Sequence, residues 1–245
     1  MDKWYEVPGK AGTNVIYSRV RLVRNLKEYP FPGRLTKEQS AELSEKLLGG
    51  LTGIASMDRM QYRFTHLERM GDLEKTALLE RRAINRGVMK KKDPTGMILS
   101  EDESTAILLN GDDHVRIQTL QTGLTLEQLY ERADKIDDYI SERFDYAFDE
   151  KYGYLTSFPT NVGTGLRAAV VLHLPMLSKN KNFNSLVADM GRFGTQVRGV
   201  YGEGAENFGS LYQISNQKTL GQTEREIIDI VRKAALELDA QERPI

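Results

Sequence analysis

The sequence predicts a single α+β domain built on a large, mostly antiparallel β-sheet flanked by helices. Segments of strand length with alternating apolar and polar residues recur along the whole chain, and several are separated only by short turns. Helical segments with 3/4 apolar spacing stand between them, but without the regular strand–helix–strand rhythm of a parallel sheet. No repeat, linker or low-complexity tract divides the 245 residues, so we expect one domain over residues 1–245.

Composition narrows the class of protein. The 34 basic and 35 acidic side chains nearly balance, which disfavours a nucleic-acid or anionic-lipid surface and requires any positive site to be local. Cysteine is absent and the 3 histidines are scattered, so we expect no disulfide, no cysteine nucleophile and no protein metal site. The N-terminus has no apolar signal region and no stretch is long enough to span a membrane, a pattern compatible with the cytoplasm.

The first half of the chain supplies most of the predicted strands. Val15–Asn25 alternates apolar residues with Arg19 and Arg21, which a strand would direct to one side. Thr36 and Gln39 form a capping box that opens a leucine-striped helix, which the following glycines end. Further strands are expected at Met60–Phe64, Met97–Leu99, Thr105–Asn110 and Val115–Leu120, with a helix at Asp72–Asn85 and a mobile basic loop at Arg86–Gly96.

The second half adds three helices and the remaining strands. Capping residues at Thr125 and Gln128 open a long amphipathic helix, and Thr223 with Glu226 opens the last helix, through Leu238. Between them we expect strands at Tyr152–Ser157, Leu166–Leu174, Gln196–Val200 and Leu211–Ser215, a helix from Phe183 to Met190, and a glycine-rich loop at Tyr201–Gly209.

The loop from Pro159 to Gly165 has the composition of an anion site. Its Gly, Thr and Asn residues allow backbone N–H groups to crowd around an anion, and Arg167 just beyond it adds a fork of donors. Neither a P-loop nor a G-x-G-x-x-G pattern is present. The loop therefore predicts a phosphate site, and the alternative is an ordinary glycine-containing turn beside a surface arginine.

Arginines recur beside turns, where strands are expected to end. They are Arg19, Arg21, Arg116, Arg167 and Arg198. Planar guanidinium groups gathered in this way could neutralise a nucleoside triphosphate during phosphoryl transfer. Acidic residues that could act as a base or bind a cation lie in neighbouring loops, namely Asp112, Asp113 and Glu203, although each taken singly could equally be a solvated charge.

Four stretches in a fixed order carry a resemblance to a known family. They are YSRVRLVRNL, NGDDHVRIQ, GYLTSFPTNVGTGLRAAVVLHLP and RFGTQVRGVYGEG, followed by YQISNQKTLG. Together they span Tyr17 to Gly221 and resemble the phosphagen, or ATP:guanidino, kinase family, most closely its bacterial protein arginine kinase branch. The resemblance implies an enzyme that transfers the γ-phosphoryl group of ATP, bound with Mg²⁺, to arginine residues of proteins.

The resemblance also assigns roles to residues. Asp112 and Glu203, with Asp113 beside them, would grip and deprotonate the guanidinium. Arg82 falls where the family often has a histidine near the adenine. The nucleotide would be bound by the five arginines, by Ser18, and by the backbone after Arg167 and Arg198, namely Ala168, Ala169, Val170, Val171, Gly199, Val200, Tyr201 and Gly202.

Departures from the family pattern leave two other functions open. The family usually reads N-E-E-D-H where this chain has Gly111 and Asp112, so the acid is one methylene shorter, and Phe158 replaces a frequent cysteine. A catalytically weakened nucleotide-binding regulator is therefore one alternative, and a small-molecule phosphagen kinase is the other. The protein arginine kinase branch carries a further helical pairing domain that we expect to be absent from residues 1–245, and the oligomeric state is open.

Overall fold

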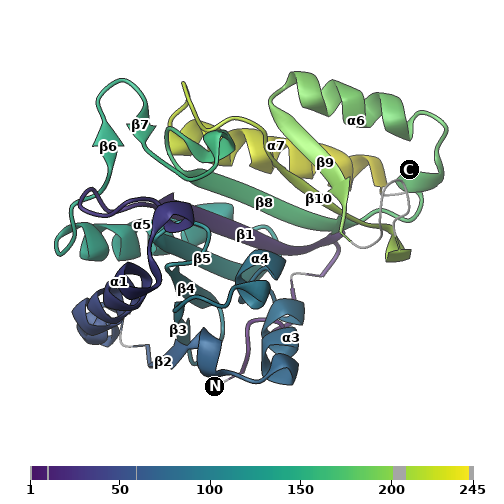
Figure 1. The fold of residues 1–245 in the computed structure, drawn as a ribbon. Coiled ribbons are helices and arrows are strands. Elements are labelled where there is room, and N and C mark those ends of the chain that lie inside the picture. Colours follow the sequence, from purple (N-terminus) through teal and green to yellow (C-terminus); the bar gives the residue numbers. More distant parts are fainter. Residues whose placement is uncertain (1, 10, 59, 201–207, 243–245) are drawn as a thin grey trace.

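An eight-stranded antiparallel sheet forms the centre of the computed structural model, which describes residues 2–9, 11–58, 60–200 and 208–242 (Figure 1). Its strand order is β2-β3-β4-β5-β1-β8-β10-β9, and all of its pairings are antiparallel. The strands are β1 (Val15–Arg24), β2 (Tyr62–His66), β3 (Gly96–Ser100), β4 (Thr105–Leu109), β5 (Val115–Thr122), β8 (Leu166–His173), β9 (Thr195–Gly199) and β10 (Leu211–Asn216). The predicted fold class is confirmed.

Helices cover the two faces of this sheet unequally. The helices are α1 (Lys37–Gly50), α2 (Ala55–Asp58), α3 (Asp72–Glu80), α4 (Arg86–Lys90), α5 (Leu126–Ser141), α6 (Phe183–Arg192) and α7 (Glu224–Glu242). The main core lies on what we call the covered face, where α1, α5, α6 and α7 pack on strand residues such as Val20, Ile117 and Val170. On the opposite face, which we call the site face, α3 and α4 pack on β3 and β4 through a smaller cluster. Trp4 packs on Tyr17, Leu120 and Val171 in a third cluster on the same face, and the polar groups of the site lie between these two clusters.

Strand β1 shows how alternation divides polar residues between the faces. Arg19 and Arg21 lie on the site face, whereas Arg24 lies on the covered face, where it is 2% exposed. There its Nε and Nη2 both donate to Asp137 Oδ2 of α5, over 3.0 and 2.6 Å, and its guanidinium stacks on Tyr154. Arg24 therefore fastens β1 to α5 and takes no part in the site.

Two predicted capping boxes are confirmed, whereas the third predicted one, at the start of α5, is not formed. Thr36 and Gln39 cap α1 reciprocally, as do Thr223 and Glu226 at α7. Thr125 also stands at the start of its helix, but its backbone N–H donates to Ser18 Oγ and its own hydroxyl caps nothing in the described structure.

The structure corrects three predicted elements. The helix expected over 72–85 ends at Glu80, because Arg82 adopts a left-handed φ of 67° and the chain turns. The loop expected to be mobile begins with α4, whose first turn Asn85 caps through Val88 N. The strand expected at Tyr152–Ser157 is only β7 (Gly153–Tyr154), paired with β6 (Phe148–Asp149), since the following residues turn into a 3-10 helix at Pro159–Asn161.

None of the helices in the described ranges combines the length and the apolar character needed to cross a bilayer.

Candidate active site

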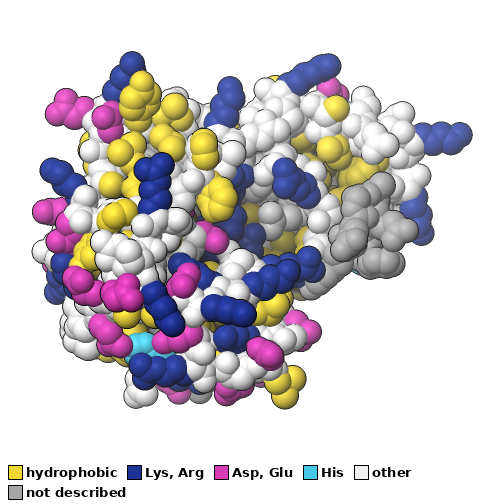
Figure 2. Space-filling model, in the orientation of Figure 1, with side chains coloured by type: hydrophobic (Ala, Val, Ile, Leu, Met, Phe, Trp, Pro, Cys, Tyr) yellow, Lys and Arg dark blue, Asp and Glu magenta, His cyan; other side chains and the backbone are white. Residues whose placement is uncertain are grey.

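The site face of the central strands carries a cluster of arginines. Arg21 of β1 pairs directly with Arg167 of β8, and Val23 of β1 pairs with Arg116 of β5. Arg198 lies further along the sheet, on β9. Figure 2 shows Lys and Arg side chains gathered around a hollow near the middle of the molecule. Antiparallel pairing therefore collects on one surface the guanidinium groups that the sequence spreads over 180 positions, from 19 to 198.

Two neighbouring cavities open on this surface. Cavity A has a volume of about 570 Å³, and cavity B has a volume of about 770 Å³. Arg21, Asn85 and Arg116 line both, so these three side chains form a shared wall. Cavity A is also lined by Asp112, Asp113, Phe158, Thr160, Asn161, Gly165, Arg167, Gln196, Arg198, Gln213, Ser215 and Gln217. Cavity B is also lined by Arg19, Thr76, Leu79, Glu80, Arg82, Ile84, Arg86, Gln118 and Val200.

The arginine cluster carries positive charge that few described acidic groups offset. The Nε atoms of Arg19 and Arg21 are buried and have no hydrogen-bond partner among the described residues. Burial, together with the neighbouring arginines, lowers the pKa of Arg21 well below its usual value and lowers the pKa of Arg116 to about 10. Unpartnered donors and crowded like charges are relieved by an anion, so the cluster has the chemistry of a polyphosphate site.

Uncharged polar groups, one from a side chain and one from the backbone, orient Arg19 and Arg167. Arg19 Nη2 donates to Gln213 Oε1 over 2.7 Å, and Arg167 Nη1 donates to the carbonyl oxygen of Asn216 over 2.8 Å. The Asn216 side chain also accepts from Ala168 N and donates to Leu166 O, which prolongs the ladder beside Arg167. Gln213 and Asn216 were not identified as site residues from the sequence. The one available signal was that Gln213 lies in a strand that pairs with β8 and β9, on the same face as Arg167 and Arg198.

Asp112 lies beside Arg116 of the arginine cluster. Its Oδ2 accepts a hydrogen bond from Asn85 Nδ2 over 2.7 Å and lies 3.8 Å from Arg116 Nη1. The side chain is about one third exposed and faces cavity A. Asp112 can therefore reach a group bound in that cavity while it stays in contact with the shared wall.

Asp113 also lines cavity A, but it is 2% exposed and holds the surrounding chain. Its Oδ1 accepts hydrogen bonds from Asn25 Nδ2 and Ser157 N, both over 2.7 Å. This carboxylate joins the end of β1 to the segment before Phe158.

His114 completes the same rigid loop. Its Nδ1 accepts from Leu26 N over 2.9 Å and its Nε2 lies 3.0 Å from Pro30 O, an arrangement that requires the neutral ring with a proton on Nε2. Burial lowers the pKa of His114 to about 4. The histidine is therefore a structural anchor between β1 and β5, and it fixes the loop that presents Asp112.

The glycine loop borders cavity A but its glycines serve packing. Gly165 has a φ of 65°, and a Cβ there would lie 2.6 Å from Val23 O. At Gly163 a Cβ would lie 2.2 Å from Thr219 O, and Thr219 Oγ1 donates to the carbonyl oxygen of Val162 over 2.7 Å. Thr160, Asn161 and Gly165 remain on the cavity surface. Close approach to Thr219 at Gly163 and to Val23 at Gly165 therefore accounts for two glycines that the sequence suggested were there for an anion.

Other residues expected to contact a nucleotide lie in several environments. Arg82 and Val200 line cavity B, and Gly199 ends β9 beside it. The structure does not bring Ser18 to the arginine cluster, because its hydroxyl lies on the covered face and donates to Gly123 O over 2.7 Å. In β8 the alternate residues Ala169 and Val171 share the site face with Arg167, Ala168 and Val170 lie in the main core, and the strand is paired on both sides. Tyr201, Gly202 and Glu203, with most of the expected loop 201–209, lie outside the described residues.

No cluster of three His, Cys, Asp or Glu side chains in the described ranges has the spacing of a metal site.

Arginines that can neutralise phosphate charge and a carboxylate that can act as a base lie around two adjoining cavities, and phosphoryl transfer uses groups of these kinds. A family model described as "ATP:guanido phosphotransferase, C-terminal catalytic domain" matches residues 45–245. The chain belongs to this family.

Named relatives and solved structures agree with the family. The chain is 38% identical to "Protein-arginine kinase" of Halothermothrix orenii over 243 residues, which are 99% of this chain and 69% of that protein. It is 40% identical to "Protein-arginine kinase" of Bacillus velezensis, covering 99% of this chain and 67% of that one. The chain thus spans about two thirds of these relatives' length.

Solved guanidino kinases share the fold. The duplicated taurocyamine kinase from Schistosoma mansoni, with bound transition-state analogue components, superposes with a TM-score of 0.82 at 27% identity, over 93% of this chain and 32% of that one. Lombricine kinase superposes with a TM-score of 0.81 at 24% identity, over 93% of this chain and 66% of that one, and this likeness concerns the fold alone.

Proposed function

We propose that this chain is an ATP-dependent kinase that transfers the γ-phosphoryl group to the guanidinium of arginine residues in proteins. Membership of the ATP:guanido phosphotransferase family supports the reaction class. The relatives named protein-arginine kinases, about 40% identical over nearly the whole chain, support a protein acceptor. The observation that carries the proposal is the shared wall. Arg21 and Arg116 line both cavities, so they could contact a molecule bound in cavity A and a molecule bound in cavity B at the point where the two molecules would meet.

In this proposal cavity B holds the nucleoside and the shared wall holds its phosphates. Arg82 and Val200 would contact the nucleoside side, and Arg19, Arg21 and Arg116 would bind the phosphate oxygens. Arg167 and Arg198 approach from cavity A, where the transferred group would lie. Fixed guanidinium groups stabilise the charge that spreads over the phosphoryl oxygens during transfer, and they do so without reorganising.

Mg²⁺ would enter with the nucleotide. This ion prefers oxygen ligands and commonly uses phosphate oxygens and water with few protein groups. That mode of binding is compatible with a site whose described residues offer arginines and few carboxylates.

Cavity A would receive the acceptor guanidinium. The acceptor guanidinium carries a proton at neutral pH, so one proton must leave it as a nitrogen attacks phosphorus and the bond to the ADP oxygen breaks. Asp112, and Glu203 outside the described residues, would orient the guanidinium and take up that proton. Asp113 would hold the loop, and Phe158, 52% exposed at the cavity rim, would lie beside the acceptor's side chain.

The experiment is incubation with Mg-ATP and either free arginine or an unfolded, arginine-rich protein, followed by detection of acid-labile phosphate. We expect faster labelling of the protein, because a protein-embedded arginine brings additional binding energy that can be used for orientation. An Asp112→Asn variant, which keeps the size of the side chain and removes the base, should lose the labelling.

Two other outcomes would reject the proposal. Faster labelling of free arginine would indicate a small-molecule phosphagen kinase. Binding of Mg-ATP without labelling of either acceptor would indicate a nucleotide-binding regulator.

A further inference from the structure

The N-terminal end of α4 holds the Asp112 carboxylate. Asn85 uses both ends of its side-chain amide: Nδ2 donates to Asp112 Oδ2 over 2.7 Å, and Oδ1 accepts from Val88 N over 2.8 Å. The second contact caps the helix, so the amide cannot rotate without losing the cap. Asn85 therefore presents a donor to Asp112 in a fixed direction.

The C-terminal end of α4 grips the same loop. Lys91 Nζ donates to the carbonyl oxygens of Asn110 and Gly111, over 2.7 and 3.0 Å. Asn110 has a left-handed φ of 55°, so this backbone has little freedom to relax by itself. The 110–112 loop is therefore held by the residues at the two ends of α4, Asn85 before the helix and Lys91 after it.

Two glycines allow the helix and the loop to approach this closely. A Cβ at Gly111 would lie 3.0 Å from Val88 Cγ2. A Cβ at Gly87 would lie 3.0 Å from Asp112 Oδ1 and 3.4 Å from Asn85 Oδ1. A side chain at position 87 would crowd the Asp112 carboxylate, so the glycine there allows Asp112 to lie against the start of α4.

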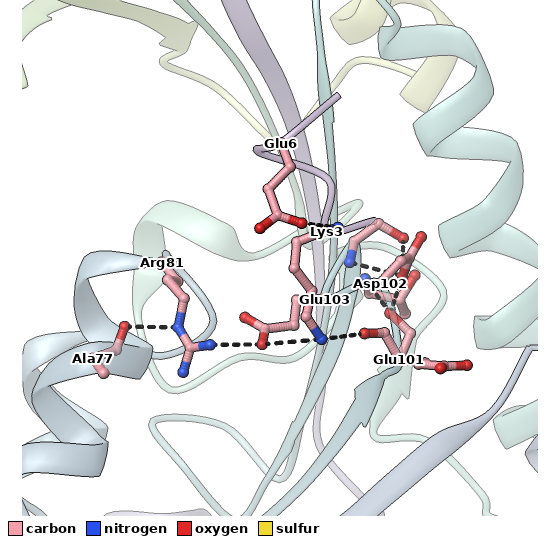
Figure 3. Close-up of polar contacts among 10 residues, drawn as sticks. Lys3, Glu6, Ala77, Arg81, Glu101, Asp102 and Glu103 are labelled. Carbon is pink, nitrogen blue, oxygen red and sulfur yellow. Dashed lines mark hydrogen bonds and ion pairs between the residues drawn. The ribbon is translucent and has the colours of Figure 1, made fainter. Parts of the chain in front are cut away.

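The connection that carries Asn85 is itself fastened. Arg81 Nη1 donates to Glu103 Oε1 over 2.7 Å, and Lys3 Nζ lies 3.7 Å from the same oxygen (Figure 3). The carbonyl oxygen of Arg82 accepts from Gln118 Nε2 of β5. Hydrogen bonds thereby join the 81–85 connection to β5 and to the turn between β3 and β4.

We infer that Asn85 is a positioning residue for phosphoryl transfer, which fixes the Asp112 carboxylate against the arginine-lined wall between the two cavities. The inference rests on the proposed function. A misplacement of about 1 Å costs on the order of 10²-fold in rate, and an aspartate has fewer rotamers with which to recover its reach than a glutamate. A donor that sets the direction of this short acid therefore affects the rate of transfer more than the binding of ATP.

The test is the Asn85→Ser variant, assayed for labelling of the arginine-rich protein. Serine is as good a helix cap as asparagine, but its hydroxyl is too short to donate to Asp112. We expect kcat to fall about 10-fold or more, while KM for ATP stays within about 2-fold. A matched control, Thr36→Ala, removes a cap from α1 away from the site and should leave kcat unchanged.

A second measurement does not depend on activity. A double-mutant cycle compares the unfolding midpoints of Asn85→Ser, Asp112→Ala and the double variant. The midpoint shift of the double variant should be smaller than the sum of the two single shifts, because each single substitution removes the same hydrogen bond. Additive midpoint shifts would overturn the inference. It would also be overturned if Asn85→Ser left kcat unchanged, or if it raised KM for ATP and did not lower kcat. If the unmutated protein labels neither acceptor, the proposed function fails first and the inference with it.

Discussion

At the scale of single residues, neighbours decide the chemical role of each charged group. Arg21 and Arg24 are three positions apart in one strand, yet Arg21 has a buried, unpartnered Nε among the described residues whereas Arg24 makes two hydrogen bonds to Asp137. Asp112 and Asp113 are adjacent, yet one faces a cavity and the other joins buried segments. Charge alone did not distinguish these pairs, but alternation along a strand separates the first of them.

Lengthening the acid tests how closely the site is fitted to this chain. Asp112→Glu should lower kcat for arginine phosphorylation about 10-fold, because the added methylene moves the carboxylate by about 1 Å from the position in which Asn85 now holds it. Steady-state rates with saturating Mg-ATP would measure it. A faster enzyme would show instead that the shorter acid is a weakened form of the family's glutamate.

His114 makes the fold sensitive to acid. The folded histidine takes up a proton only near pH 4, whereas an unfolded one does so near 6.5, so the unfolded chain binds more protons between these values and stability rises with pH across that window. The difference corresponds to about 3 kcal/mol of unfolding free energy lost on acidification to pH 4. Chemical denaturation of His114→Gln should give a flatter dependence from pH 4 to 6.5, although the variant is less stable at pH 7. His173→Gln, at an exposed position, is the control, and equal slopes in all three proteins would contradict the assignment.

At the scale of elements, short segments do most to build the site. Helix α4 holds the acid-bearing loop, the 81–85 connection carries Arg82 and Asn85, and the loop 159–165 packs on the chain around Thr219. Each is held by hydrogen bonds to residues far away in the sequence. Such contacts explain why the stretch expected to be a mobile loop contains an ordered helix.

The glycine at the end of the loop 159–165 can be tested by stability. Gly165→Ala should lower the unfolding free energy by roughly 2–3 kcal/mol, because alanine is strained at a φ of 65° and its Cβ would meet Val23 O. Gly49→Ala is the matched control: it lies in α1 with open space around its Cβ, and alanine should be neutral or stabilising by up to about 1 kcal/mol. Denaturant titration measures both, and similar shifts would show that Gly165 is not sterically required.

At the scale of the whole molecule, the sheet brings together charges that a nearly neutral chain keeps apart. The net charge is −1, yet five arginines lie on one surface. Burial lowers the pKa of Arg19, Arg21, Arg116 and Arg167, and neighbouring arginines lower each of these values further. The folded protein is therefore expected to gain stability when an anion binds.

That gain can be measured as a shift in thermal unfolding. Mg-ATP at about 100 times its Kd should stabilise the protein by about 2.7 kcal/mol, and the shift should shrink with added salt as the charges are screened. Arg167→Ala should abolish most of the shift, whereas Arg225→Ala, on the exposed side of α7, should preserve it. The absence of any shift in the unmutated protein would reject nucleotide binding and the kinase proposal together.

The sequence by itself determined the fold class, the order of most strands and helices, and the candidate arginines. These depend on local patterns: alternation along strands, 3/4 spacing in helices and capping residues, which neighbouring residues fix without help from distant ones. The stretches that resemble guanidino kinases gave the family, which the family model supports.

Only the tertiary structure decided which polar groups meet. The contacts of Asn85 with Asp112, Gln213 with Arg19 and Asn216 with Arg167 join residues 27 to 194 positions apart, and no local pattern marks them. The structure also assigned the glycines of the loop 159–165 to close packing and ended α3 at Glu80. The physical reason is the same throughout: hydrogen bonding and close approach depend on strand register and helix packing, which are properties of the whole chain.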